Sequence, residues 1–396
     1  MPHCKSPYDA REDSTLLKKH VRALAYGSVL DMGTGSGIQA ITAALQERVT
    51  SVIALDIQKE VIAYCKKNIS NRKIQFLVSD LFSTLEKNKV FKNVQFDTII
   101  FNPPYLPQEL KVRDVELEGG KEGYETLERF LSKISQFLKK EGICLILFSS
   151  LTKKKNVDDI IKRYLLEFEL LESQRYFFEE LFVYKVTKSP LLKTMEEKDI
   201  KNARYFNRGK RGFIFTGLLG KKKIAMKVWN KDSRSLAKTE HEANILEKIN
   251  KQSIGPKLIL GEKDFFAYEF VDGIEFLDFI EKNNNKKTIK SVIEKIFEQL
   301  YVLDSMNLNK EEMSHPHKHI LITKKNEPVL IDFERARYAM KPGNVTQFCD
   351  FLSSKEVNLY LGSKNILVLP SIIEKAKEYK REMTTSKVKN IIDSIQ

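Results

Sequence analysis

Short apolar runs in the first half of the chain are each followed closely by a polar residue. The runs cover residues 28–30, 52–55, 74–78 and 96–101. Segments of this length that are almost continuously apolar are typical of strands buried on both faces of a parallel sheet. The polar residues that follow them are Asp31, Asp56, Asp80 and Asn102. The pattern predicts an α/β domain with an open, Rossmann-like sheet.

The polar residues are expected to share one crevice, because ligands bind at the carboxyl ends of the strands in such sheets. The first strand runs into Asp31-Met-Gly-Thr-Gly-Ser-Gly37, a pattern typical of S-adenosylmethionine enzymes. Its third glycine comes one residue too early for the dinucleotide fingerprint. Gly33 and Gly35 would let the backbone approach a ligand closely, and Asp31 could accept a hydrogen bond from an ammonium group.

The strand over residues 96–101 ends at Asn102-Pro103-Pro104-Tyr105. Proline has no N–H, so the hydrogen-bond ladder stops there and leaves a stiff corner with free carbonyl groups. The Asn102 side-chain oxygen and the Pro103 carbonyl could accept both hydrogens of a planar –NH2 group, which the Tyr105 ring would cover. The corner therefore predicts catalytic roles for Asn102, Pro103 and Tyr105. A plain strand-to-loop turn is the alternative.

Residues 1 to about 187 resemble the HemK family of release-factor glutamine methyltransferases, in particular its archaeal and eukaryotic branch. Four motifs carry the resemblance: YDAREDSTLL at 8–17, DMGTGSG at 31–37, NPPY at 102–105 and EGGKEGYE at 118–125. The resemblance implies an S-adenosylmethionine cofactor. Its implied contacts are Ser14, Asp31 and Gly33 for the methionine moiety, Asp56 for the ribose, Asp80 and Leu81 for the adenine, and Asn102 beside the methyl group.

The resemblance also implies partners. The substrate would be the glutamine amide in a Gly-Gly-Gln loop of a peptide-chain release factor. A small zinc-binding activator subunit would pair along an edge of the sheet, although the second half of the chain could cover that surface instead. Because NPPY also occurs in DNA and RNA adenine methyltransferases, an adenine amino-methyltransferase anchored by a basic second half remains open.

A polar segment with Pro190, residues 188–200, predicts a linker between domains 1–187 and 201–396. A Gly-rich segment then precedes a strand that contains Lys227, the helix expected over 234–250 offers Glu242, and a later strand ends at Asp332. This half resembles the small atypical protein kinases, such as the RIO and KEOPS-associated kinases. The resemblance implies an α+β kinase-like domain that binds Mg-ATP through Lys227, Glu242 and Asp332, with Asp332 holding the metal.

The stretch over residues 312–319 departs from the kinase pattern. Ser314 stands where the catalytic base is expected, and His319 replaces the metal-binding Asn. A pseudokinase, or a docking module for RNA or the ribosome, is therefore nearly as good an interpretation as an active kinase. His315, His317 and His319 alternate, so an extended strand would place them on one face, where a metal site is conceivable. Residues 372–379 have the apolar spacing of an amphipathic helix.

Charge and composition add a second argument for a phosphate-bearing partner. Residues 191–396 carry 38 Lys and Arg against 28 Asp and Glu, within a net charge of +14 for the chain. Nucleotide, RNA or ribosome would meet this half, unless it is simply a Lys-rich surface. No apolar run approaches the roughly 18 residues of a membrane span. The four cysteines are scattered singly, which predicts reduced thiols in a cytoplasmic protein.

Overall fold

The computed structural model describes residues 12–104, 123–208, 212–229 and 237–396. They form two compact units whose boundary falls between Tyr205 and Phe206. Residues 188–200, expected as a linker, contain the end of one strand, a complete helix and the start of the next strand. Within the described ranges, no helix is both long and apolar enough to cross a membrane.

The first unit is built on a seven-stranded mixed sheet. Its strands are β1 (Gly27–Met32), β2 (Val49–Asp56), β3 (Ile74–Val78), β4 (Phe96–Phe101), β5 (Leu138–Ser149), β6 (Leu166–Arg175) and β7 (Glu180–Lys188). They lie in the order β3-β2-β1-β4-β5-β7-β6. Strands β1 to β5 pair in parallel, and β7 is antiparallel to both of its neighbours. The predicted parallel sheet is confirmed, with polar residues at its carboxyl edge.

The sequence of residues 181–186 is apolar apart from Lys185 and predicts a last strand at the edge of the sheet, but the structure places it inside the sheet. They belong to β7, which pairs with β6 on its outer side. Strand β6 is mostly exposed and carries several charged residues, so its sequence lacks the apolar run that marks the inner strands.

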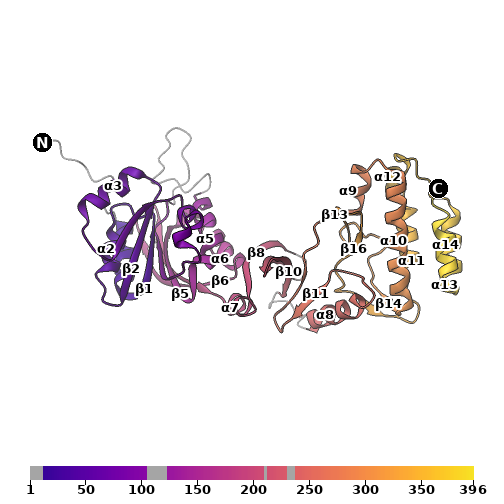
Figure 1. Cartoon of the computed structure of the whole chain (residues 1–396), viewed down its shortest axis with the longest axis horizontal. Helices are drawn as coiled ribbons and strands as arrows, with labels where there is room; N and C mark the ends of the chain where they lie inside the picture. Colours follow the sequence, from indigo (N-terminus) through magenta and orange to yellow (C-terminus); the bar gives the residue numbers. More distant parts are fainter. Residues whose placement is uncertain (1–11, 105–122, 209–211, 230–236) are drawn as a thin grey trace. The chain divides into compact units, whose positions relative to one another are not determined.

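Helices cover both faces of this sheet. Figure 1 shows α2 (Ile38–Ala44) and α3 (Lys59–Asn68) on one side of it, and α5 (Glu125–Phe137) and α6 (Lys154–Arg163) on the other. Helix α1 (Glu12–Leu24) packs against α2. The short helix α4 (Ser83–Lys87) follows β3, and α7 (Pro190–Glu197) follows β7. The apolar faces of α1, α2 and α3 form a buried core with β1 and β2.

The second unit begins with a five-stranded sheet. The strands are β8 (Ile200–Arg208), β9 (Gly212–Leu219), β10 (Lys222–Trp229), β11 (Leu258–Gly261) and β12 (Phe265–Glu269). Their order is β11-β12-β10-β9-β8. Strand β10, which carries Lys227, is antiparallel to both of its neighbours, β9 and β12. Helix α8 (Ala237–Asn250) contacts β11 and β12.

The rest of this unit is mainly helical. Its helices are α9 (Phe276–Lys282), α10 (Lys286–Ser305), α11 (Asn344–Leu352), α12 (Lys355–Gly362), α13 (Ser371–Arg381) and α14 (Thr385–Ile392). Two small sheets join β13 (Gly273–Glu275), β15 (Ile320–Thr323) and β16 (Pro328–Leu330), and β14 (Leu308–Asn309) with β17 (Arg337–Tyr338). The amphipathic segment expected at the end of the chain is α13. Its buried Tyr379 donates a 3.0 Å hydrogen bond to the buried Asp304 of α10.

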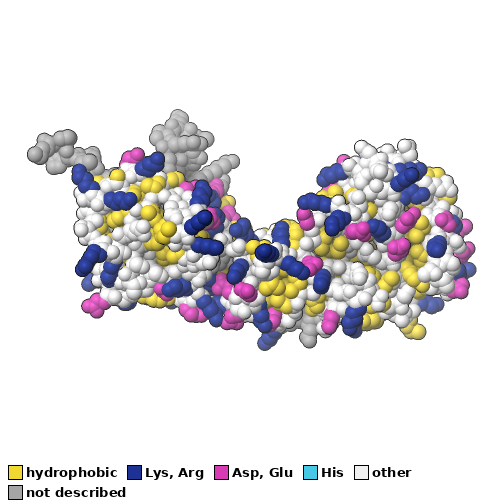
Figure 2. Space-filling model, viewed as in Figure 1, with side chains coloured by type: hydrophobic (Ala, Val, Ile, Leu, Met, Phe, Trp, Pro, Cys, Tyr) yellow, Lys and Arg dark blue, Asp and Glu magenta, His cyan; other side chains and the backbone are white. Residues whose placement is uncertain are grey.

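On the face shown in Figure 2, Lys and Arg side chains are spread among acidic and hydrophobic ones in both units. The described residues on this face form no continuous basic surface of the kind that binds nucleic acid.

Candidate active site

One pocket lies at the carboxyl edge of the sheet in the first unit. Its lining brings together most of the residues expected to hold a cofactor or substrate: Ser14, Gly33, Gly35, Asp56, Asp80, Leu81, Asn102 and Pro103. Asp31 lies directly beneath the Gly-rich turn and is 1% exposed. Tyr105 and residues 118–122, on which further expectations rest, lie outside the described residues.

The Asp31 carboxylate is held in place by its own turn. Its Oδ2 accepts a 2.6 Å hydrogen bond from the Thr34 hydroxyl. Burial raises the pKa of Asp31 to about 7. Such a carboxylate is poised to become charged when a cation binds beside it, because an opposite charge favours the ionised form.

The Asp56 carboxylate fixes the Gly-rich turn from the neighbouring strand. Its Oδ2 accepts from the Gly35 backbone N–H at 3.0 Å, and its Oδ1 accepts from the Gln58 N–H at 3.0 Å. Each oxygen keeps a further lone pair, so the carboxylate can still accept from the hydroxyls of a ligand. Gly33 and Gly35 have φ angles of 65° and 50°, a left-handed conformation that favours glycine.

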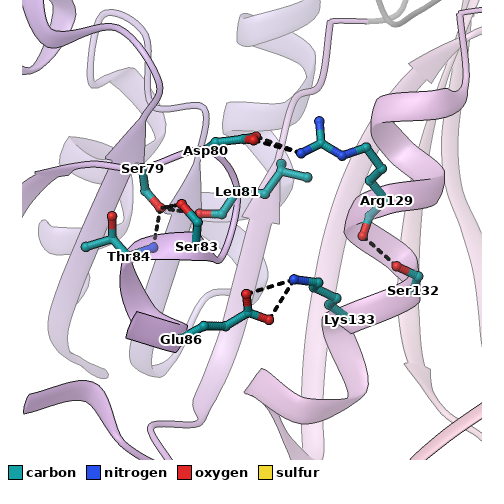
Figure 3. A network of polar contacts seen from close by, with 9 residues as sticks. All are labelled: Ser79, Asp80, Leu81, Ser83, Thr84, Glu86, Arg129, Ser132 and Lys133. Carbon is teal, nitrogen blue, oxygen red and sulfur yellow. Dashed lines mark hydrogen bonds and ion pairs between the residues drawn. The ribbon is translucent and has the colours of Figure 1, made fainter. Parts of the chain in front are cut away.

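Arg129 of α5 binds the Asp80 carboxylate at the rim of the pocket. The Nη2 atom of Arg129 lies 3.0 Å from Oδ1 and 2.8 Å from Oδ2 of Asp80 (Figure 3). Next to Asp80, Leu81 adopts a φ of 47°, and its carbonyl oxygen accepts from the Ser79 hydroxyl at 2.6 Å. This hydrogen bond helps to hold Leu81 in a backbone conformation that a leucine rarely adopts.

Asp13 of α1 orients the Asn102 amide at the end of β4. The Asn102 Nδ2 donates to the Asp13 Oδ2 at 3.1 Å, and Asp13 is 4% exposed. Since a carboxylate can only accept, this hydrogen bond requires the NH2 side of the Asn102 amide to face Asp13. The Asn102 Oδ1 consequently points the other way, and it is buried with no hydrogen-bond partner among the residues that the structure describes.

Two further residues that line the same pocket have a buried polar atom with no hydrogen-bond partner in the described part of the chain: the Ser36 Oγ and the Gln39 Oε1. Gln39 is fixed by its other end, since its Nε2 donates to the Ser14 carbonyl at 2.8 Å. Leaving a buried acceptor unsatisfied costs about 1–3 kcal/mol. Three such atoms around one pocket indicate that it accommodates a ligand with several hydrogen-bond donors.

Sequence reasoning missed three residues of this pocket. Asp13 lies in the first turn of α1, where an acidic side chain ordinarily complements the helix dipole. Gln39 and Arg129 lie inside helices, in no motif that the sequence analysis used. Their roles depend on side chains that meet across the fold, so the sequence alone carries no signal for them.

Comparison with known proteins places this unit in a family. The methyltransferase small domain family matches residues 9–178. A putative protein N5-glutamine methyltransferase from Methanocaldococcus jannaschii is 34% identical over 183 residues, which cover 44% of this chain and 89% of the relative. The chain belongs to the protein N5-glutamine methyltransferase family. Its first unit is thus an S-adenosylmethionine-dependent methyltransferase domain.

Other relatives of this methyltransferase match over a shorter stretch. A release factor glutamine methyltransferase from Koribacter versatilis and a ribosomal protein uL3 glutamine methyltransferase from Burkholderia pseudomallei are each 33% identical. They cover 29% and 30% of this chain, which in turn spans only 43% and 44% of their lengths. The Mtq2–Trm112 complex of E. cuniculi, which methylates the termination factor eRF1, contains a chain that is 24% identical to this one. The TM-score of that structural match is 0.37. That match covers 46% of this chain and 98% of that one.

A second group of charged residues lies in the other unit of this methyltransferase, where the structure brings Lys227, Glu242 and Asp332 together. The Lys227 Nζ lies 2.6 Å from Glu242 and 3.1 Å from Asp332. It also lies 3.2 Å from Glu334, which sequence reasoning did not single out. Burial alone would lower the pKa of Lys227, but these three carboxylates raise it above its ordinary value.

The three alternating histidines do not share one face. Residues 311–319 form turns and bends, so the premise of an extended strand is wrong. His317 packs edge-on against the Phe351 ring, and His315 is exposed. Of the three, only His319 faces the carboxylates, with its Nε2 3.3 Å from Glu312.

Proposed function

We propose that the methyltransferase unit transfers a methyl group to the side-chain amide nitrogen of a glutamine in a peptide-chain release factor. The observation that carries the proposal is the buried, unpartnered Oδ1 of Asn102, held by Asp13 at the end of β4. An acceptor fixed in this way suits a primary amide, whose N–H it can bind. Relatives named for release factor and ribosomal protein glutamines support the substrate class.

The chemistry of the corner follows from the weakness of the amide as a nucleophile. S-adenosylmethionine supplies an electrophilic methyl group on a sulfonium. Asn102 and the Pro103 carbonyl accept the two amide hydrogens, which orients the nitrogen lone pair and raises its electron density. The methyl group would pass from the sulfonium to the amide nitrogen, leaving the neutral thioether, and the alkylated nitrogen would release one proton to solvent. No strong base is needed, because this proton becomes acidic only after alkylation.

Mass spectrometry of release factor incubated with enzyme and isotope-labelled cofactor tests this proposal. The expected product carries one labelled methyl group on the glutamine of its Gly-Gly-Gln loop. Ribosomal protein uL3, DNA and RNA are assayed in parallel. Label on adenine would overturn the proposal in favour of an adenine amino-methyltransferase, and label only on uL3 would replace the substrate but keep the chemistry.

The affinity for the cofactor is expected to depend on pH through Asp31. Since burial raises the pKa of Asp31 to about 7, the free enzyme loses its charge there as the pH falls below 7. The attraction for the cofactor ammonium is lost with it, so affinity should weaken roughly fivefold from pH 7 to pH 6. Calorimetric titration across this range measures the change. Asp31→Asn should bind weakly at both pH values, and a wild-type affinity independent of pH would contradict the assignment.

We further propose that a small activator subunit pairs with the edge strand β3. This strand closes one end of the sheet, so no strand among the described residues lies beside its outer N–H and C=O groups. Its Val78 is 37% exposed. With a partner added along this edge, solubility and turnover should both increase over the purified chain alone. Full activity of the isolated chain in the labelling assay would rule the subunit out.

For the second unit we infer binding of a magnesium nucleotide. Lys227, held by Glu242, would meet the α- and β-phosphates, and Asp332 would hold the metal. The 2.6 Å Lys227–Glu242 ion pair favours this function. Phosphoryl transfer is not included, since Ser314 stands at the position of the catalytic base. If no nucleotide binds, a docking module for RNA or the ribosome becomes the better interpretation of this unit.

A further inference from the structure

Two adjacent phenylalanines lie in solvent in the methyltransferase unit. Phe177 and Phe178 are 92% and 86% exposed, in the turn that joins β6 to β7. Their rings pack edge-on against each other, with centroids 4.6 Å apart. Single exposed apolar side chains are common on protein surfaces, whereas aromatic residues are enriched where a surface is covered by a partner. The exposed pair therefore needs an account of what covers it.

The turn lies at the same edge of the sheet as the catalytic corner. Strand β7 is antiparallel to β5 and begins beside its carboxyl end, where Leu181 pairs with Ser149. Asn102 follows β4, which is the neighbour of β5 on the other side. Since neighbouring strands are about 4.8 Å apart, β4 and β7 are separated by roughly 10 Å. A protein that presents a side chain to Asn102 would also reach the turn, because a typical interface covers about 800 Å² of each partner.

Helix α1 connects this hairpin with the side chain that orients Asn102. Tyr176, the first residue of the turn, packs against the buried core to which α1 contributes. Burial and the nearby carboxylates of Glu12 and Asp13 raise the pKa of Tyr176. Further along β6, Glu172 pairs with a lysine of α1 at 2.8 Å. The hairpin is thus fixed to the helix whose first turn carries Asp13.

Hydrogen bonds also fix the turn itself. The Tyr176 N–H donates to the Glu179 carbonyl at 2.8 Å, and the Glu180 N–H donates to the Ser150 hydroxyl at 3.0 Å. A surface that is already ordered loses less conformational freedom when a partner binds. The Oε2 of Glu179 is buried and has no hydrogen-bond partner among the described residues. The turn therefore offers a partner two aromatic rings and an acceptor that is still to be satisfied.

We propose that Phe177 and Phe178 dock the substrate protein, through an apolar segment that lies near the methylated glutamine. The inference rests on the proposed function and names the surface that would recognise the substrate outside the catalytic corner. Residues 172–180 carry three Glu and one Arg, a balance that disfavours the phosphates of a nucleic acid. The proposed activator subunit would lie along β3, at the opposite end of the sheet from β6, and would leave this turn free.

Combining Phe177→Ala with Phe178→Ala tests the docking role in the full chain. The titrant is the protein that the labelling assay identifies as substrate, either release factor or uL3, and the enzyme is saturated with S-adenosylhomocysteine. The double variant should bind this protein about tenfold more weakly or worse, as loss of central interface aromatics typically does. KM for the protein should rise in parallel. Turnover at saturating substrate and the affinity for S-adenosylmethionine should both persist, since neither ring lines the cofactor pocket.

Leu45→Ala is the matched control. Leu45 is an apolar residue of the same unit that is 70% exposed, and it lies just before β2, at the edge where the parallel strands begin. This variant should bind the substrate protein as the wild type does, and circular dichroism checks that each variant is folded.

The docking role and the proposed function fail in different ways. If the wild type methylates a protein glutamine but the folded double variant keeps the wild-type affinity and KM, only the docking role is overturned. If the wild type labels adenine or no protein glutamine, the proposed function is overturned, and the docking role with it. A wild-type dimer that the double variant converts to a monomer in light scattering would assign the pair to a contact between two copies and would also overturn the proposal.

Discussion

Replacing Asn102 with alanine is expected to lower turnover about 100-fold or more while the affinity for S-adenosylmethionine stays within a few-fold. Removal of one preorganised hydrogen-bonding group at a reacting centre typically has an effect of this size. The Asn102 Oδ1 is the buried acceptor that remains for the substrate amide, because Asp13 binds the other side of the group. Cofactor affinity is expected to rest mainly on Asp31 and Asp56, which belong to other strands.

Asp56→Ala is the reciprocal control for this division of roles. It should weaken cofactor binding, because Asp56 both faces the pocket and fixes the Gly35 backbone. Single-turnover kinetics at saturating cofactor would separate the chemical step from binding in each variant. If calorimetry showed the two variants losing cofactor equally, Asn102 would be a cofactor ligand and not the group that orients the substrate.

The sequence predicted those parts of the site that depend on strand order. Apolar runs locate buried strands, and the residues after them must meet at one edge once the strands are parallel. The sequence alone therefore predicts that Asp31, Asp56 and Asn102 lie at the same edge of the sheet. Strand β6 escaped this reasoning, because an exposed and charged edge strand has no apolar run to reveal it.

Side-chain partnerships could not be predicted in the same way. The Asp13–Asn102 hydrogen bond joins residues 89 positions apart, and the Asp80–Arg129 pair joins residues 49 positions apart. Such contacts depend on how helices pack on the sheet. The apolar spacing of a helix shows which face is buried, but not which side chains that face will meet. In the second unit, Lys227 and Asp332 could be paired through the kinase resemblance alone. Glu334 could not, because the resemblance assigns it no role.

Lys227→Ala is expected to abolish the thermal stabilisation that ATP and Mg²⁺ give to the second unit. ATP at 100 times its dissociation constant stabilises a protein by about 2.7 kcal/mol, which corresponds to roughly 5–10 °C for a unit of this size. Three carboxylates hold the Lys227 ammonium group in a fixed position. Without it, negative phosphates would face Glu242, Asp332 and Glu334 without their shared counter-charge, and like charges repel.

Melting temperatures of the same variant with and without ligand separate the loss of binding from any loss of stability caused by the substitution itself. Stabilisation by S-adenosylmethionine should persist in Lys227→Ala, since the cofactor pocket belongs to the other unit. Lys223→Ala removes an exposed lysine of the same strand, whose Nζ lies over the Phe270 ring, and should retain the ATP shift. Absence of a shift in the wild-type protein at millimolar ATP would refute nucleotide binding. The carboxylates around Lys227 would then act as a structural network, and RNA or ribosome contact would become the remaining explanation for the excess of basic residues in this half.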